Sequence, residues 1–457
     1  MNDIFKDYGE KGISEIFGDM NSSDFELYIY SLKKLAENNL ENNKTFLTNL
    51  YNIRAFHYKA QEIMLENRQE KFAIIILDFS NFKSINEFCG REAGDGLLKA
   101  TAKALSDEVS DMVVVSHFRA DTFALLMPFN TETDIIEAIE RIDEKIADYK
   151  LPYRVFPAFG VCIADSHNMA VPLMCDYAKM ALNSIKGKFY AKYCFFDENM
   201  RKKMLFAKMI ENDIVDALEA ERLCIFIQPK VNMETGRVVG GEALVRWKFK
   251  GNKIVSPAEF IPVIEQNGLI IDVDIYVWTL VFKTIGRWFR EGKNVVPISV
   301  NISRLHAFDT NFVDVLINLS KKYNVPPRLV TLELTESGFL ENDREMFISI
   351  RKLKEYGFII SMDDFGTGYS TMTVLKDQPV DEIKIDKGFI DDITNSKCKS
   401  IIRHTVAMLR ELGVSMIVEG VENKEQMDFL LECGCTYAQG FYFYKPLSIN
   451  EFEKLID

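Results

Sequence analysis

A repeated alternation of short β-rich runs and helical stretches in the C-terminal half constrains the fold more than any other feature. Between the runs, apolar residues recur at three- and four-residue spacing, as in the stretch that contains Ile401, Met408 and Leu412. So many alternations within about 250 residues predict a closed parallel (β/α)8 barrel of the TIM type. The expected strands are Leu223–Gln228, Gly240–Trp247, Val296–Asn301, Leu329–Leu334, Phe358–Asp363, Glu382–Asp386, Ser415–Glu419 and Tyr437–Tyr442.

The N-terminal half has fewer and longer elements. At 457 residues the chain is long enough for two or three domains. We expect a short helical segment over residues 1–41, an α/β domain with a central sheet and flanking helices over 42–199, a connecting helix over 200–220, and the barrel over 221–457. The first segment holds one amphipathic helix, Asp24–Glu37. The expected strands of the α/β domain are Phe72–Phe79, Val113–Phe118, Thr122–Met127 and Val155–Ile163.

Composition narrows the class of protein. Apolar residues make up 47% and charged residues 27%, as is usual for soluble globular proteins. No apolar run approaches the ~18 residues of a membrane span, and the first residues lack the pattern of a secretory signal. We therefore expect a cytoplasmic protein whose eight scattered cysteines are free thiols. The net charge of −13 argues against DNA or RNA as a partner, so an anionic substrate would require bound cations.

Acidic residues gather at the expected strand ends. They lie in Gly241-Glu242-Ala243-Leu244, Glu333-Leu334-Thr335-Glu336, Asp363-Asp364-Phe365-Gly366 and Glu419-Gly420-Val421-Glu422, and Asn301 ends another strand. One such acid alone is more often a solvated loop or helix-cap residue. Five strand ends together are not explained in that way, because the strand ends of a (β/α) barrel meet at one mouth.

Like charges at one mouth repel unless a cation lies between them. Oxygen ligands without nearby His or Cys favour Mg²⁺ or Mn²⁺. Two such ions are a recurrent arrangement for phosphodiester hydrolysis, and Asp363 and Asp364 could bridge them. Lys384, inside an apolar strand, could orient the attacking water or stabilise the charge that develops on the phosphate.

These motifs resemble the EAL family of cyclic di-GMP phosphodiesterases over roughly residues 204–457. The resemblance rests on Glu242-Ala243-Leu244, Asn301, Glu333-Leu334-Thr335-Glu336, the run Asp363 to Ser370, Lys384-Ile385-Asp386, Glu419-Gly420-Val421-Glu422 and Gln439-Gly440-Phe441, which occur in the family's order. It implies metal-dependent hydrolysis of cyclic di-GMP to linear 5′-pGpG.

The resemblance also implies roles for single residues. Glu242, Asn301, Glu333 and Asp363 match the ligands of one metal ion, and Asp363, Asp364 and Glu419 those of the other. Lys384 matches the residue at the nucleophilic water, Glu336 an acid that holds the loop after Asp363, and Glu422 a supporting acid. Residues that match the substrate groove are Gln228, Leu244, Arg246, Asp386, Gln439 and Pro446. Arg246 could instead form a structural ion pair.

A second resemblance covers the N-terminal half. Leu47 to Phe56, Asp78 to Lys83, and Asn86, Gly90, Gly94 and Asp95 resemble a GGDEF diguanylate cyclase domain. Its signature is degenerate, because Arg119-Ala120-Asp121-Thr122-Phe123 stands in its place. The family has two glycines where this chain has Arg119 and Ala120, and side chains there obstruct the approach of nucleotide phosphates. Thr122 replaces a carboxylate that binds metal in the family. We therefore expect no cyclase activity.

Two questions stay open at this level. Asp78, Asn86 and Asp95 match metal and guanine ligands, so the degenerate domain could bind GTP as a regulator, or these residues could be purely structural. The barrel could also be a receptor that binds cyclic di-GMP and signals through a protein partner without hydrolysis. Loss of a ligand or of Lys384 would favour the receptor, and none is lost. The family resemblance also suggests a homodimer through the barrel.

Overall fold

The computed structural model describes most of the chain. The described residues are 43–152, 155–166, 169–188, 191–249, 254–308, 311–336, 339, 344–366, 380–391, 393 and 395–456. The helix expected over Asp24–Glu37 lies outside them. The chain forms two compact units that divide between Leu205 and Phe206, and each unit is described by itself. Among the described residues, no helix combines the length and apolar composition needed to cross a bilayer.

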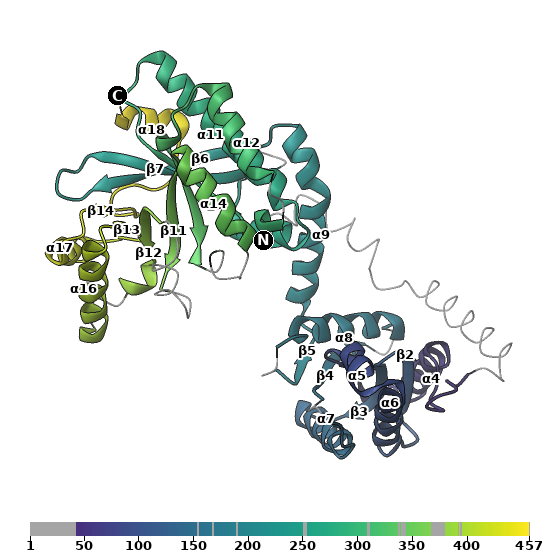
Figure 1. The fold of residues 1–457 in the computed structure, drawn as a ribbon. Coiled ribbons are helices and arrows are strands. Elements are labelled where there is room, and N and C mark those ends of the chain that lie inside the picture. The colour runs from purple at the N-terminus through teal and green to yellow at the C-terminus, as the bar shows by residue number, and fades with distance from the viewer. Residues whose placement is uncertain are drawn as a thin grey trace. The chain divides into compact units, whose positions relative to one another are not determined.

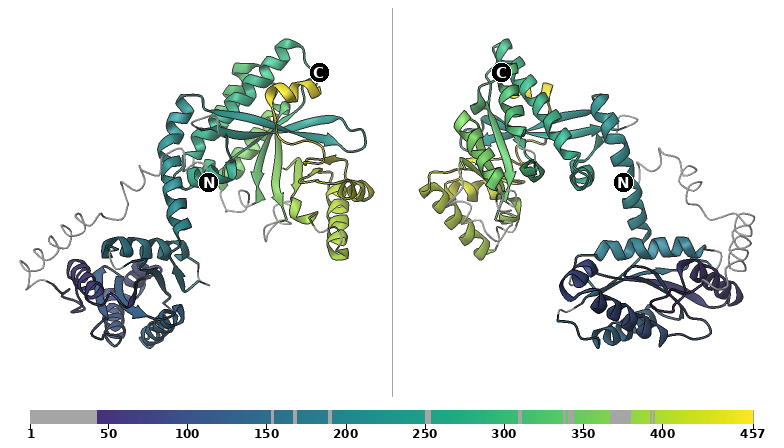
Figure 2. Two further views of the ribbon diagram at one scale, coloured as in Figure 1. Left: turned by 180° about the vertical axis from the view of Figure 1, so that it is seen from behind. Right: turned by 45° about the vertical axis from the view of Figure 1, so that its right-hand side comes forward.

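The N-terminal unit is a five-stranded sheet covered by helices on both faces (Figure 2). The strand order is β2-β3-β1-β4-β5, with β1 antiparallel to both neighbours. Its strands are β1 (Lys71–Phe79), β2 (Val114–Arg119), β3 (Thr122–Phe129), β4 (Pro157–Ile163) and β5 (Tyr193–Phe195). Its helices are α4 (Ile53–Glu66), α5 (Phe82–Cys89), α6 (Arg91–Ser106), α7 (Glu132–Ala147) and α8 (Val171–Ile185). Only β5 was not expected from the sequence.

Strand β1 is the centre of this unit because both of its faces are buried. Ile74 and Ile76 pack against α4 and α8, whereas Ile75 and Leu77 pack against α6 and α7. An apolar run without alternation, such as residues 72–77, is typical of a strand between two helical layers. The strand ends at Asp78 and Phe79, at one edge of the unit.

The C-terminal unit contains a barrel of eight strands, which the pairing of β6 with β7 closes. They are β6 (Leu223–Asn232), β7 (Val238–Lys248), β9 (Ile298–Asn301), β10 (Val330–Thr335), β11 (Ile359–Phe365), β12 (Glu382–Ile385), β13 (Ser415–Val418) and β14 (Tyr437–Ala438). Each expected strand overlaps one of these. The short strands β8 (Ile254–Val255) and β15 (Leu447–Ser448) pair with β7 and β6.

Helices lie outside the barrel strands (Figure 1). They are α10 (Pro257–Gln266), α11 (Ile270–Glu291), α12 (Phe312–Tyr323), α14 (Arg344–Tyr356), α16 (Ser396–Glu411), α17 (Lys424–Cys433) and α18 (Ile449–Ile456). Helix α9 (Glu198–Glu219) includes the division between the units, and its buried apolar positions in the C-terminal unit are Phe206, Ile210, Ile214 and Ala217.

The prediction of an entirely parallel barrel was wrong for the first strand. β6 runs antiparallel to both β7 and β14, whereas the other neighbouring pairs of the barrel are parallel. β6 and β7 are joined by the short segment Met233–Arg237, which suits an antiparallel hairpin, since a parallel connection needs a crossover of a dozen residues or more.

Candidate active site

The carboxylates converge on the barrel mouth, where the parallel strands end. Asn301 ends β9, Glu333 lies in β10, Asp363 and Asp364 lie in β11, and Glu419 follows β13. Glu242 corrects one expectation, because it lies well inside the long strand β7 and not at its end. It still faces the same interior, since its Oε2 lies 3.4 Å from the Nζ of Lys384.

Lys384 is the centre of the cluster. Its Nζ lies 2.6 Å from Glu419 Oε1, 2.9 Å from Glu333 Oε2, 3.1 Å from Asp363 Oδ2 and 3.4 Å from Glu242 Oε2. Burial lowers the pKa of Lys384, but the four carboxylates raise it well above its usual value. A permanently charged ammonium group therefore joins acids from β7, β10, β11 and the end of β13.

The carboxylates of the cluster differ in the direction of their pKa shifts. Burial raises the pKa of Glu333, but Lys230 and Lys384 outweigh it and lower that pKa to about 2. Burial raises the pKa of Glu419 to about 8, with Asp363 and Glu242 adding to the shift and Lys384 opposing it. Burial also raises the pKa values of Glu242 and Asp363. The site therefore contains one firmly ionised acid among several that are difficult to ionise together.

Acids outnumber lysines in the printed contacts of this cluster. Five acids contact Lys230 or Lys384, namely Glu242, Glu333, Asp363, Glu382 and Glu419, and Asp364 lies beside Asp363 and Glu419. Among the described residues, these five acids share two lysines. Divalent cations would balance such an excess of negative charge, so the donor set fits them.

The geometry also fits metal ligation. Oxygen atoms of Asp363, Asp364 and Glu419 lie within 4.8 Å of one another. Asp364 reaches this position through a left-handed backbone (φ 56°), at a register irregularity between β11 and β12. The second predicted ligand set is also assembled, because Glu333 and Asp363 share Lys384 with Glu242, and Asn301 Nδ2 donates to Glu242 Oε1 at 3.4 Å.

The two predicted supporting acids behave differently. Glu336 is buried, and its Oε2 accepts a hydrogen bond from the Gly366 backbone N–H at 3.2 Å. This bond ties the start of the segment after Asp364 to the end of β10. Glu422 is exposed, and the structure does not bring its side chain into the lysine–carboxylate cluster.

Glutamines connect the cluster to β6 and to the chain before β15. Gln439 Nε2 donates to Glu242 Oε2 at 2.6 Å and to Gln228 Oε1 at 3.2 Å. Gln228 Nε2 donates to the Tyr444 carbonyl at 3.3 Å. Both side chains are buried, so they orient Glu242 as well as line the mouth.

The other predicted groove residues lie nearer the rim. Leu244 and Pro446 are half-buried. The Arg246 guanidinium donates to the Val245 carbonyl at 2.8 Å and lies 5.7 Å from the centre of the Phe226 ring, and no ion pair engages it among the described residues. Asp386 accepts from the Gly388 N–H at 2.8 Å. Arg246 is therefore held by its own strand and not by a structural acid.

The sequence prediction missed two groups. Lys230, in β6, is buried and contacts Glu333 and Glu382. A lysine two residues after Gln228 shares its face of the strand, and that spacing was the available signal. The other group is the buried pair Asp274 and His306, 3.1 Å apart, in which Asp274 also accepts from the Ser303 N–H and so fastens the segment after Asn301.

The N-terminal unit has a smaller polar site at the end of β1. Asp78 Oδ1 lies 2.8 Å from Lys186 Nζ, and Thr122 Oγ1 donates to Asp78 Oδ2 at 3.2 Å. Both carboxylate oxygens of Asp78 are therefore engaged within the chain. Asn86 packs against Gly94, where an added Cβ would lie 2.0 Å from Asn86 Oδ1, and Asp95 is exposed on α6.

The degenerate signature forms the tight turn between β2 and β3. Arg119 pairs with Thr122, and Ala120 has a left-handed backbone (φ 48°). His117 holds the turn, since its Nε2 lies 2.9 Å from the Ala120 carbonyl and its ring stacks on Phe123. An alanine thus occupies a backbone conformation that favours glycine.

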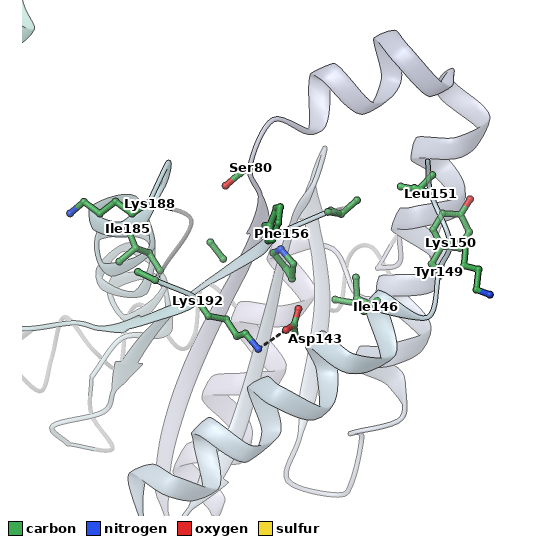
Figure 3. A pocket seen from close by; sticks show the side chains of 15 residues that line it. Ser80, Asp143, Ile146, Tyr149, Lys150, Leu151, Phe156, Ile185, Lys188 and Lys192 are labelled. Carbon is green, nitrogen blue, oxygen red and sulfur yellow. Dashed lines mark ion pairs between the residues drawn. The ribbon is translucent and has the colours of Figure 1, made fainter. Parts of the chain in front are cut away.

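A cavity of about 610 Å³ lies near Ser80 in the same unit (Figure 3). Lys192 forms an ion pair with Asp143 at 2.6 Å, and Figure 3 shows Lys150 and Lys188 pointing away from each other. None of Asp78, Asn86 and Asp95 is among its described lining residues. The predicted GTP ligands therefore do not line this cavity, although Ser80, two residues after Asp78, does.

Comparison with known proteins agrees with this architecture. Residues 45–188 match the family described as "Diguanylate cyclase, GGDEF domain", and residues 211–446 match "EAL domain". "Signaling protein YkoW" of Bacillus subtilis is 31% identical over 84% of this chain and 49% of its own length. "Cyclic di-GMP phosphodiesterase PdeR" of Escherichia coli is 29% identical over 90% of this chain and 63% of its own length. The chain thus spans from about half to less than two thirds of the length of these relatives.

Solved structures resemble the barrel unit. The structure titled "PaMucR Phosphodiesterase, c-di-GMP complex" is 33% identical, with a TM-score of 0.51, over 53% of this chain and 99% of its own. A "Vibrio cholerae LapD S helix-GGDEF-EAL" structure covers 91% of this chain and all of its own with a TM-score of 0.51, but its 18% identity supports the fold alone. Three findings agree: the match over residues 211–446, the acids at the barrel mouth and the similarity to the relatives. The chain belongs to the EAL domain family, and a domain of the GGDEF family precedes its EAL domain.

Proposed function

We propose that the barrel hydrolyses cyclic di-GMP to linear 5′-pGpG with the help of two divalent metal ions, Mg²⁺ or Mn²⁺. The observation that carries this proposal is a buried cluster in which five carboxylates contact two lysines and Asp364 lies beside Asp363 and Glu419, a donor set that divalent cations would suit. The relatives named as cyclic di-GMP phosphodiesterases support the choice of substrate.

The reaction is an in-line displacement. A water oxygen forms a bond to one phosphorus, the bond from that phosphorus to the 3′ oxygen breaks, and a proton reaches the departing 3′ oxygen. Divalent ions, when bound, neutralise the phosphate and favour ionisation of the water. Glu242, Asn301, Glu333 and Asp363 would hold one ion, and Asp363, Asp364 and Glu419 the other.

The chain's own residues would stabilise the reacting phosphate and bind the dinucleotide. Lys384, fixed by four carboxylates, presents a permanent positive charge to the attacking water or to the charge that develops on the phosphate. Gln228, Leu244, Arg246, Asp386, Gln439 and Pro446 would line the groove for the dinucleotide. Arg246, which lacks an acidic partner among the described residues, is available to grip a phosphate or a guanine edge.

For the N-terminal domain we propose no cyclase activity. Asp78 already contacts Lys186 and Thr122, and the carboxylate that Thr122 replaces is missing. Regulation by GTP through Asp78, Asn86 and Asp95 is tested by titrating GTP while heat of binding and hydrolysis of cyclic di-GMP are followed. If GTP gives no heat of binding and does not change the rate of hydrolysis, the domain has a purely structural role. A homodimer through the barrel is tested by light scattering of the full chain.

The direct experiment incubates the purified chain with cyclic di-GMP and either Mg²⁺ or Mn²⁺ and separates the products. Accumulation of 5′-pGpG supports the proposal, and intact substrate with both ions favours the receptor alternative. Glu242→Ala adds a second criterion. An enzyme should lose turnover with this change, whereas a receptor should continue to signal through its partner.

A further inference from the structure

Lys230 is a fully enclosed charge with three partners. Its Nζ lies 2.6 Å from Ser299 Oγ, 2.9 Å from Glu333 Oε1 and 3.2 Å from Glu382 Oε1, and the residue is 4% exposed. Burial of a lysine is costly unless its charge is paired. Its retention at this depth calls for a role that an apolar side chain could not fill.

The strand register places Lys230 below the predicted metal ligands. Because β6 is antiparallel to its neighbours, a residue two positions after Gln228 lies deeper in the barrel. In the parallel strands the deeper residues come two positions earlier. Ser299, Ser361 and Glu382 precede Asn301, Asp363 and Lys384 in this way. We call Lys230, Ser299, Ser361 and Glu382 the lower layer.

The lower layer is internally bonded. Ser361 Oγ donates to Glu382 Oε1 at 3.1 Å, and the same oxygen accepts from Lys230. Barrel interiors at this level are usually filled with branched apolar side chains. Four polar residues from β6, β9, β11 and β12 therefore form a rigid support for whatever lies above them.

Glu333 is the link between this layer and the mouth. Lys230 contacts its Oε1 and Lys384 contacts its Oε2, each at 2.9 Å. With one ammonium group on each oxygen, the carboxylate plane cannot rotate freely. Each oxygen still has a second lone pair, so this restraint is compatible with metal ligation.

We propose that Lys230 is a positioning residue that holds Glu333 in the orientation needed to bind a divalent ion. This inference rests on the proposed metal-dependent function. The competing explanation is that Lys230 only neutralises Glu382 inside the core. The two explanations differ in what happens when both charges of that pair are removed together.

The test compares the full-length wild-type chain with K230M/E382Q. The double change removes Lys230 without leaving Glu382 as an unpaired buried charge. We expect the thermal transition to persist, while Mn²⁺ binding, followed by the electron paramagnetic resonance of free Mn²⁺, weakens about 10- to 100-fold, as for other changes behind a ligand. The metal concentration for half-maximal hydrolysis should rise in parallel, with a smaller fall in kcat. Wild-type Mn²⁺ affinity in K230M/E382Q would overturn the proposal.

Two further variants protect the test. K352M makes the same exchange at an exposed lysine of α14 and should bind Mn²⁺ like the wild type. Ser299→Ala removes only the hydroxyl that Lys230 contacts, so it covers the case in which the double variant does not fold. It should weaken Mn²⁺ binding by a few fold, and no weakening would count against the proposal. If the wild type binds no Mn²⁺ and hydrolyses no cyclic di-GMP with either Mg²⁺ or Mn²⁺, the proposed function is refuted, and this inference with it.

Discussion

The two units place similar groups at the end of a central strand but balance their charges differently. In the N-terminal unit, Asp78 at the end of β1 contacts Lys186 and Thr122. In the barrel, Asp363 in β11 contacts Lys384, but three further carboxylates contact the same ammonium group. Asp121 also interacts with Asp78 through a side-chain hydrogen bond, so the smaller site has two acids for one lysine, whereas four acids contact Lys384 in the barrel.

This difference is one of degree. In the smaller site the hydroxyl of Thr122 adds a hydrogen bond but no charge, and burial and Asp78 raise the pKa of Asp121. In the barrel four acids contact Lys384, and burial raises the pKa values of Glu242, Asp363 and Glu419. The smaller site therefore has a smaller excess of acid than the barrel cluster, which we propose as the metal site.

The strongest test of this contrast exchanges each lysine for methionine. Lys384→Met should lower kcat for cyclic di-GMP about 100- to 1,000-fold, because a preorganised charge at the reacting phosphate is lost. Lys186→Met should leave kcat within a few fold. Product separation measures both, and circular dichroism checks that both variants fold. An equal loss of kcat in the two variants would contradict the assignment of a catalytic role to Lys384 alone.

Metal removal and pH should affect the barrel next most strongly. Chelation should abolish hydrolysis, and added Mn²⁺ should restore it.

Glu419 has a raised pKa of about 8, so below pH 8 a metal must displace its proton. Apparent Mn²⁺ affinity should therefore rise with pH by up to about tenfold per unit and level off above pH 8. Glu333, with a pKa of about 2, stays ionised throughout this range.

A pH-independent Mn²⁺ affinity between pH 6 and 8 would contradict this assignment. Glu419→Gln is the matched control, since it cannot release a proton and should remove most of the slope while binding Mn²⁺ more weakly.

A smaller effect is expected when a carboxylate is returned to the degenerate site. Thr122→Glu would face Asp78, with Lys186 as the nearest contacting cation, and should destabilise β1 by about 1–3 kcal/mol because like charges are buried together. Added Mn²⁺ should recover that loss. Hydrogen exchange of β1 amides measures both effects. Thr122→Gln, of similar size without charge, should not respond to Mn²⁺, and an equal response would point to a packing effect.

The smallest expected change concerns the turn of the degenerate signature. Ala120→Gly relieves a left-handed backbone at φ 48° and should stabilise the N-terminal unit by about 1 kcal/mol or less, since glycine also gains freedom in the unfolded chain. Hydrogen exchange in β2 and β3 measures it. Cyclase activity should not return, because Thr122 is unchanged. If cyclase activity did appear in Ala120→Gly, the residue at position 120 alone would account for its absence from the wild-type domain.

Much of the architecture was predictable because local patterns carry it. The alternation of strands and helices indicated the barrel, and the apolar run of residues 72–77 indicated a buried strand. The acids were found because each stands beside a β-rich run. The direction of β6 was not predicted, since a strand's own apolar pattern is the same in either direction.

The sequence by itself determined which acids and which lysine could form a site, because residue type and position along each strand depend only on local order. Tertiary structure alone decided how they share charge. It brought Lys384 within 3.4 Å of four acids, turned Lys230 toward Glu333 through the reversed β6, and left Glu422 exposed. The physical reason is that these contacts join residues up to 142 positions apart, so only closure of the barrel sets the distances on which their electrostatics depend.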